Sequence, residues 1–162
     1  DVTIQAQILE LMKSLREQNR MAIMLITHDL GVIAEMADEV VVMYAGKVVE
    51  RADVGTIFER PHHPYTKGLL ASIPRLGEKR ERLAVIKGTV PNPLNLPAGC
   101  LFKRRCPYAM PVCDTPPPYQ AVGDKHLSRC WLTPEGAAPV IGPDAAPEVA
   151  VEAAARFSVE GA

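Results

Sequence analysis

Four cysteines are the residues of this chain most suited to chemistry, and all of them lie in residues 100–130. Cys100, Cys106, Cys113 and Cys130 are separated by five, six and sixteen residues. Structural zinc sites usually contain two cysteines only about two to four residues apart, and no pair here is that close. The wider spacing suits a larger inorganic core bound by four thiolates, and a proline directly after Cys106 is typical of ferredoxin-type sites. Zinc, disulfides and free thiols remain alternatives, although no targeting segment favours an oxidising compartment.

Basic residues flank these cysteines in the sequence, at Lys103, Arg104, Arg105 and Arg129. A core bound by four thiolates is anionic, so nearby cations would offset its charge and raise its reduction potential. Few aromatic residues lie nearby, so we expect the cysteine loop to have little core of its own. A bound metal would then organise the loop.

A histidine is the second candidate for chemistry, because Thr27-His28-Asp29 follows the apolar run Met21–Ile26. In open α/β sheets, ligands bind just beyond the carboxyl ends of the parallel strands. A histidine there can donate a hydrogen bond to a phosphate oxygen or hold an attacking water. The alternative is a structural role in which His28 caps the following helix.

The elements that would position these groups alternate between helix and strand. Apolar residues at helical spacing predict an amphipathic helix over residues 4–15. Residues 21–26 predict a strand buried inside a parallel sheet, and residues 30–37 a short helix. Residues 40–50 predict two strands joined by a tight turn at Ala45-Gly46. This order indicates an α/β fold with a parallel sheet.

Composition changes after this region and predicts three parts: residues 1–60, 61–132 and 133–162. Pro64 favours the first turn of a short helix, where its missing N–H has no helical partner. Prolines in residues 84–99 favour an extended loop. The Ala- and Pro-rich residues 133–162 predict a largely disordered tail.

Charge and hydropathy exclude some functions. The chain has 18 Lys and Arg against 19 Asp and Glu, a net charge of −1, which disfavours a nucleic-acid partner. The longest apolar run, Met21–Ile26, is far shorter than the roughly 20 residues that cross a bilayer. The chain opens at Asp1 directly into helical periodicity, so we expect it to be the later part of a longer protein.

Residues 1–60 closely resemble the end of an ABC-transporter nucleotide-binding domain. The resemblance rests on Asp1-Val2-Thr3 before a helix, on Leu25-Ile26-Thr27-His28-Asp29-Leu30, and on the run from Ala37 to Glu50. It implies that Asp1 closes the D-loop at the interface with a second ATPase subunit. It also implies that His28 is the switch histidine, which contacts the γ-phosphate of ATP.

Residues 61–132 resemble the extension of oligopeptide and dipeptide importer ATPases. The matching strings are His63-Pro64-Tyr65, the run Gly88–Leu94, and Gly-Cys-Leu-Phe-Lys-Arg-Arg-Cys-Pro-Tyr-Ala-Met from Gly99 to Met110. By this resemblance, the four cysteines bind a [4Fe–4S] cluster of structural or regulatory role. The expected fold is therefore the C-terminal part of an ABC ATPase domain, followed by a small irregular extension that contains the cysteines.

The resemblance implies an ATP-hydrolysing subunit, using ATP and Mg²⁺, at the cytoplasmic face of the cell membrane. Its partners would be a second ATPase subunit, transmembrane permease subunits and, indirectly, a peptide-binding protein. The chain contains no phosphate-binding loop of the form G-x-x-x-x-G-K-[ST], so we expect it to be inactive alone. The alternative function is a stand-alone metal-binding interaction or redox-sensing module formed by residues 61–132.

Overall fold

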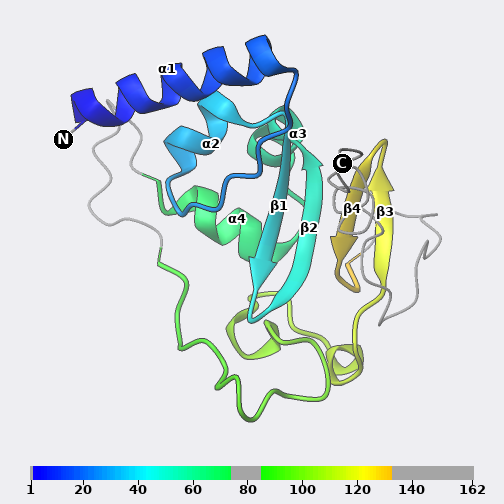
Figure 1. Ribbon diagram of the computed structural model, residues 1–162. Coiled ribbons are helices and arrows are strands. Elements are labelled where there is room, and N and C mark those ends of the chain that lie inside the picture. The colour runs from blue at the N-terminus through cyan, green and yellow to red at the C-terminus, as the bar shows by residue number, and fades with distance from the viewer. Residues whose placement is uncertain (1, 74–84, 133–162) are drawn as a thin grey trace, which may run out of the picture.

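The computed structural model describes residues 2–73 and 85–132 (Figure 1). Asp1 and the expected disordered tail at 133–162 lie outside the described residues. In chain order, the elements are α1 (Val2–Asn19), α2 (Leu30–Met36), β1 (Glu39–Tyr44), β2 (Lys47–Asp53), α3 (Val54–Glu59), α4 (Pro64–Ala71), the 3₁₀ turns η1 (Lys103–Arg105) and η2 (Pro111–Asp114), β3 (Tyr119–Gly123) and β4 (His126–Arg129).

Helix α1 confirms the predicted amphipathic helix and ends where the chain turns at Arg20, whose φ is 50°. Its Leu9 is buried, and its other attachments are polar contacts such as Lys13 with Glu35 at 2.8 Å and Arg16 with Asp38 at 3.1 Å. Exposed ion pairs of this kind stabilise a fold by at most about 1 kcal/mol. The helix is therefore held weakly by the described residues.

The segment Met21–Ile26 does not form the predicted buried strand. Its residues adopt no regular structure, and Met24 and Ile26 are 87% and 89% exposed. A strand needs a neighbour that satisfies its N–H and C=O groups, and no described strand pairs with this segment. The prediction of a parallel sheet is also wrong for the described residues, because every strand pair among them is antiparallel.

The predicted hairpin is confirmed in β1 and β2. Its turn residues Ala45 and Gly46 have φ of 47° and 78°, the positive values that a two-residue hairpin turn of type I′ requires. Val40 and Ala52, one from each strand, pack with Ile57 of α3 in a small core. The Asp53 carboxylate caps α3 by accepting the N–H of Thr56 at 2.9 Å.

The expectation of an irregular extension is met only in part, because the extension adds two strands to the hairpin. The sheet order is β1-β2-β4-β3, so β4 pairs with β2 although 72 residues separate the end of β2 from the start of β4. Glu50 lies opposite Ser128, and Arg51 lies opposite Leu127. The extension therefore shares one sheet with the preceding part of the chain (Figure 1).

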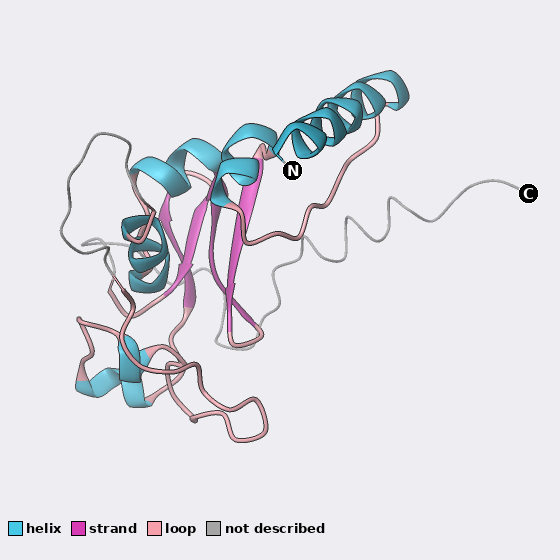
Figure 2. Cartoon of the chain, turned by 90° about the vertical axis from the view of Figure 1, so that its left-hand side faces the viewer, coloured by secondary structure: helices cyan, strands magenta, loops and turns pink. Residues whose placement is uncertain are grey.

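The sheet lies between two groups of connecting elements. Helices α1, α2 and α3 gather towards one end of the sheet, and the loop that contains η1 and η2 lies at the opposite end (Figures 1 and 2). None of the described helices is long and apolar enough to cross a membrane. The cysteine loop thus occupies the end of the sheet where β1 turns into β2.

The uncovered apolar face of α1 leads to a first prediction. Ile4, Ile8 and Leu11 are 57%, 52% and 59% exposed, and an apolar patch of this kind favours association. We expect the chain to self-associate at micromolar concentration, and the double variant Ile8→Lys, Leu11→Lys to be largely monomeric. Light scattering coupled to gel filtration measures this, and Gln5→Lys with Gln7→Lys on the same helix is the control. A monomeric unsubstituted chain would contradict the prediction.

Candidate functional site

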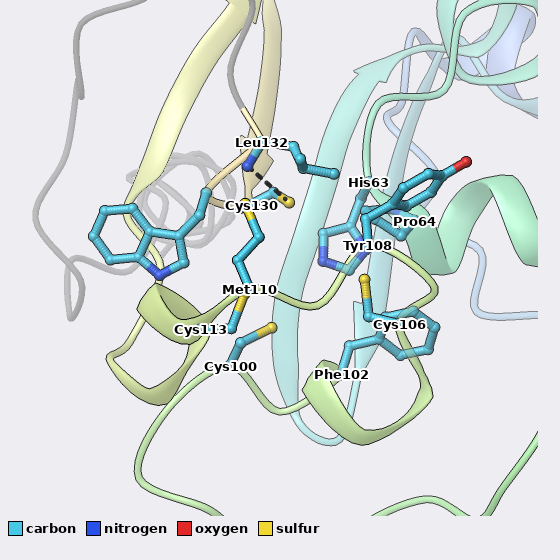
Figure 3. Close-up of a pocket in the computed structure, with 11 residues that line it drawn as sticks. His63, Pro64, Cys100, Phe102, Cys106, Tyr108, Met110, Cys113, Cys130 and Leu132 are labelled. Carbon is cyan, nitrogen blue, oxygen red and sulfur yellow. Dashed lines mark hydrogen bonds between the residues drawn. The ribbon is translucent and has the colours of Figure 1, made fainter.

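The four cysteines predicted to act together line one pocket in the structure. They share it with His63, Pro64, Phe102, Tyr108, Met110, Trp131 and Leu132 (Figure 3). Cys100 and Cys106 flank η1, and Cys113 lies in η2. Cys130 follows β4 directly. Sequence reasoning thus identified residues that the fold brings together from two separate segments.

Close backbone contact brings the first and third cysteines side by side. The N–H of Cys100 donates to the carbonyl of Cys113 at 2.9 Å. A Cβ at Gly99 would lie 2.4 Å from that same carbonyl oxygen and 2.7 Å from the carbonyl oxygen of Asp114. Only glycine fits here without moving the backbone, which explains a glycine next to the first cysteine.

Backbone N–H groups are directed at three of the four sulfur atoms. Leu132 N–H donates to Cys130 Sγ at 3.4 Å, and Tyr108 N–H donates to the thiol of Cys106. The thiol of Cys100 accepts from Phe102 and Lys103. Hydrogen bonds of this kind stabilise thiolates and tune the potential of iron–sulfur sites.

Burial and mutual proximity keep three of the metal-free thiols protonated. Burial raises the pKa of Cys100, Cys106 and Cys130, and the neighbouring thiols raise each pKa further. The pKa of Cys130 reaches about 11. Thiols in this state are poor nucleophiles at neutral pH, so the pocket does not resemble that of a reactive cysteine. A cation that binds here would have to displace their protons.

The cysteine side chains of the described residues are not arranged around a single ion. Within residues 2–73 and 85–132, no three Cys, His, Asp or Glu side chains are arranged so that they could hold one metal ion. In Figure 3, Cys106 lies across the pocket from Cys100, Cys113 and Cys130. Zinc requires all its sulfur ligands about 2.3 Å from one point. The four thiols surround a common space but do not converge on one point.

The prediction that the cysteine loop has little core is wrong. Phe102 is 2% exposed and packs on Tyr44 of β1 and Val49 of β2. Its ring centroid lies 5.2 Å from that of Tyr44 and 5.5 Å from that of Tyr65 in α4. The aromatic partners come from distant segments, so counting aromatics near the cysteines in sequence misses them. This packing supports the loop independently of any ligand.

The flanking cations serve the fold and do not line the pocket in the described part of the chain. Lys103 pairs with Asp114 at 2.5 Å. Arg105 donates to the carbonyls of Ile86 and Lys87 and stacks on the ring of Tyr44. Their positive charge still lies near the cysteines, but their hydrogen bonds go to the surrounding loop.

A buried carboxylate beside the pocket was not predicted. Glu50 on β2 is fully buried and accepts the N–H groups of His62 at 2.5 Å and His63 at 3.0 Å. His126 Nε2 lies 2.7 Å from the same carboxylate. Burial alone would raise the pKa of Glu50, but these hydrogen bonds, with the nearby Thr66 side chain, outweigh it and lower the pKa. The partners of Glu50 are remote in sequence, so the periodicity of apolar residues does not predict these contacts.

His63 joins this carboxylate to the cysteine pocket. Its Nδ1 accepts the N–H of Tyr65 at 3.1 Å, which caps α4 and assigns the ring proton to Nε2. The ring also hydrogen-bonds the backbone of Arg129, the residue before Cys130. Burial lowers the pKa of His63 to about 4, so the ring is neutral at physiological pH.

His28 lies in the exposed loop before α2. The capping role that was its alternative belongs to Asp29, whose carboxylate accepts from Gly31 N–H at 2.9 Å and Val32 N–H at 3.3 Å. The His28 side chain forms no hydrogen bond with another described residue and is accessible to a ligand.

The lowered pKa of His63 predicts a pH dependence of stability. The unfolded chain, with a pKa near 6.5, binds more protons between pH 6.5 and 4 than the folded chain does. The contribution of His63 to the unfolding free energy is fully present above pH 6.5. It is lost as the pH falls towards 4, and the loss is up to about 3 kcal/mol. His63→Asn keeps a capping side chain and should flatten the pH dependence of the unfolding free energy, measured by denaturant titration of the metal-free chain.

The exposed His28 supplies the matched control for this measurement. His28→Asn makes the same replacement at an exposed side chain that forms no hydrogen bond with another described residue, and so controls for the effect of the substitution itself. If His63→Asn gave the same pH dependence of the unfolding free energy as the unsubstituted chain, His63 would not titrate as stated.

Comparison with known proteins agrees with these features. Residues 49–113 match the family model of the oligopeptide/dipeptide transporter, C-terminal region. The chain is 58% identical over 136 residues to the oligopeptide transport ATP-binding protein AppD of Bacillus subtilis, covering 83% of this chain and 42% of that protein. It is 52% identical over 133 residues to the dipeptide transport ATP-binding protein DppD of Bacillus subtilis, covering 82% of this chain and 40% of that protein.

A putative peptide import ATP-binding protein of Brucella ovis is 50% identical over 137 residues, with 80% of this chain and 40% of the relative covered. The chain thus spans about two fifths of the length of the curated relatives it matches. The matches extend over most of the chain, including both the hairpin and the cysteine-containing extension. Residues 49–113 therefore match the C-terminal region of oligopeptide/dipeptide transporter proteins, and most of the chain is similar to ATP-binding proteins of peptide transport.

Proposed function

We propose that this chain belongs to an ATP-hydrolysing subunit that supplies energy to an importer of dipeptides or oligopeptides. The observation that carries the proposal is the 58% identity to the oligopeptide transport ATP-binding protein over 136 residues. An accessible His28 and an apolar face on α1 that the described residues do not cover support it. Both features suit a piece of a larger nucleotide-binding domain.

In the complete subunit, bound ATP with Mg²⁺ supplies the phosphoryl group that is hydrolysed. His28 would contact the γ-phosphate and could hold the attacking water, since a neutral histidine can both donate and accept a hydrogen bond. Asp29 fixes the backbone after His28 by capping α2. Asp1 contributes at the interface with a second ATPase subunit. The other partners are permease subunits in the membrane and, through them, a peptide-binding protein.

We also propose that the four cysteines bind a [4Fe–4S] cluster, which would add a structural or regulatory centre to the subunit. Two features support this: the four thiols share one pocket, and backbone N–H groups act on three of the sulfurs. Zinc stays the alternative metal. The other alternative, an independent metal-binding module, gains no support because the extension pairs with β2 and packs on the hairpin.

The subunit is expected at the cytoplasmic face of the membrane, held there by its partners. Cargo would be selected by the peptide-binding and permease subunits.

Substitution of His28 tests the nucleotide proposal. In the complete subunit, His28→Ala should leave ATP binding roughly intact and slow hydrolysis at least tenfold, equivalent to about 1.4 kcal/mol of barrier. Steady-state phosphate release and nucleotide titration measure the two effects. Glu35→Gln on the neighbouring helix is the control and should retain activity, because Glu35 pairs with Lys13 of α1 and forms no other ion pair among the described residues. An unchanged turnover number for His28→Ala would remove His28 from the site.

Metal analysis of protein prepared without oxygen tests the cluster proposal. The protein should be brown, absorb broadly near about 400 nm, and contain roughly four iron and four sulfide per chain. Cys106→Ser should lower the iron content sharply and make residues 99–132 sensitive to protease, since one iron loses its ligand. Met110→Leu is the control, because Met110 lines the same pocket and its replacement should keep the iron.

Each alternative predicts a different result for the same preparation. A colourless protein with one zinc per chain would replace the cluster with a zinc site. No metal, with a change of electrophoretic mobility on reduction, would indicate disulfides.

A further inference from the structure

The fourth cysteine reaches the pocket by a different route from the other three. Cys100, Cys106 and Cys113 belong to one loop, which backbone hydrogen bonds and the buried Phe102 hold together. Cys130 instead follows β4. Its position at the pocket therefore depends on how β4 lies against β2.

The backbone ladder between these two strands is short. Among the described residues, only two residue pairs lie opposite each other in this ladder, Glu50 with Ser128 and Arg51 with Leu127. A pairing of this length is weak unless side chains add to it. Something beyond the ladder must fix β4 in place.

The side chain of Glu50 provides that addition at the start of β4. Its fully buried carboxylate accepts from His126, the first residue of β4, at 2.7 Å. The same carboxylate accepts the N–H groups of His62 and His63. A buried carboxylate needs all these partners, so loss of one acceptor oxygen leaves a donor unsatisfied.

A second set of contacts acts at the other end of β4. Arg129 Nε donates to the carbonyl of Val48 at 3.0 Å, and the ring of His63 hydrogen-bonds the Arg129 backbone. Since Glu50 holds the backbone of His63, the carboxylate is connected to both ends of β4. Ser128 adds a link in the middle, where its hydroxyl lies 3.0 Å from Nδ1 of His62.

We propose that Glu50 is a positioning residue for the four-cysteine site, which holds Cys130 at the pocket by fixing β4 through His126 and His63. Glu50 touches no sulfur atom and acts only through these neighbours. The inference rests on the proposed function only for its metal readout, because the placement of a thiol can be measured without metal.

Thiol alkylation of the metal-free whole chain tests this. In Glu50→Gln, one carboxylate oxygen becomes an NH₂ group that cannot accept, so β4 should open locally more often. We expect the alkylation rate of Cys130, followed by mass spectrometry under reducing, oxygen-free conditions, to rise at least about tenfold. The rates of Cys100, Cys106 and Cys113 should change less than about twofold. Glu39→Gln, the same substitution at an exposed carboxylate of β1, should change none of them.

A second pair of variants covers the case in which Glu50→Gln fails to fold. His126→Ala removes the donor to Glu50 and should expose Cys130 selectively, whereas His126→Gln offers a new N–H donor and should restore protection. A purely structural role of His126 would not distinguish these two replacements. Equal acceleration at all four cysteines, or an unchanged rate at Cys130, overturns the inference.

The metal readout separates this inference from the proposed function. In metal-loaded protein, Glu50→Gln should release metal to a chelator at least about tenfold faster than the unsubstituted chain does. If the protein binds no metal but Cys130 alone is exposed in Glu50→Gln, the positioning role stands and the cluster proposal fails. If metal is bound and Cys130 stays protected in that variant, the cluster stands and the positioning role fails.

Discussion

A carboxylate cannot be taken out of water unless hydrogen bonds replace its hydration, and Glu50 is completely buried. The replacement donors come from two places: the backbone at His62 and His63, and the ring of His126. These segments meet only if the chain before α4 and the strand β4 both fold against β2. One buried charge therefore links the hairpin, the start of α4 and the extension.

The aromatic cluster adds an apolar counterpart to this polar link. Phe102 brings the cysteine loop against Tyr44 and Tyr65, so the loop packs on the same hairpin that carries Glu50. The cysteine pocket is thus built on a folded scaffold, and a ligand there would complete a structure that packing has already shaped. By contrast, α1 and residues 21–26 present apolar side chains to solvent and attach through exposed polar contacts.

The two candidate chemistries occupy different parts of the molecule. His28 lies in an exposed loop next to the weakly held α1, where large apolar surface is available for packing. The thiols lie at the opposite end of the sheet, shielded and supplied with N–H donors. A nucleotide contact that must open and close suits the first setting, and a permanently bound centre suits the second.

Local patterns in the sequence determined α1, the β1–β2 hairpin and the start of α4 at Pro64, because helix periodicity, turn chemistry and proline geometry act between neighbours in the chain. The strings around His63 and from Gly99 to Met110 also indicated the similarity to peptide transporters, and the spacing of the four cysteines singled out side chains that line one pocket. Only the tertiary structure decided how Cys130 joins the other cysteines, since the pairing of β4 with β2 spans most of the extension.

Tertiary structure also decided that residues 21–26 form no strand. Their sequence pattern is strand-like, but no strand among the described residues pairs with them. The burial of Glu50 was not predicted, because it depends on partners that are distant in the sequence. An acidic residue near the middle of a hairpin strand gives no sign of burial until partners as distant as His126 supply hydrogen bonds. Pairing and desolvation depend on groups that meet in space, so they cannot be read from local order along the chain.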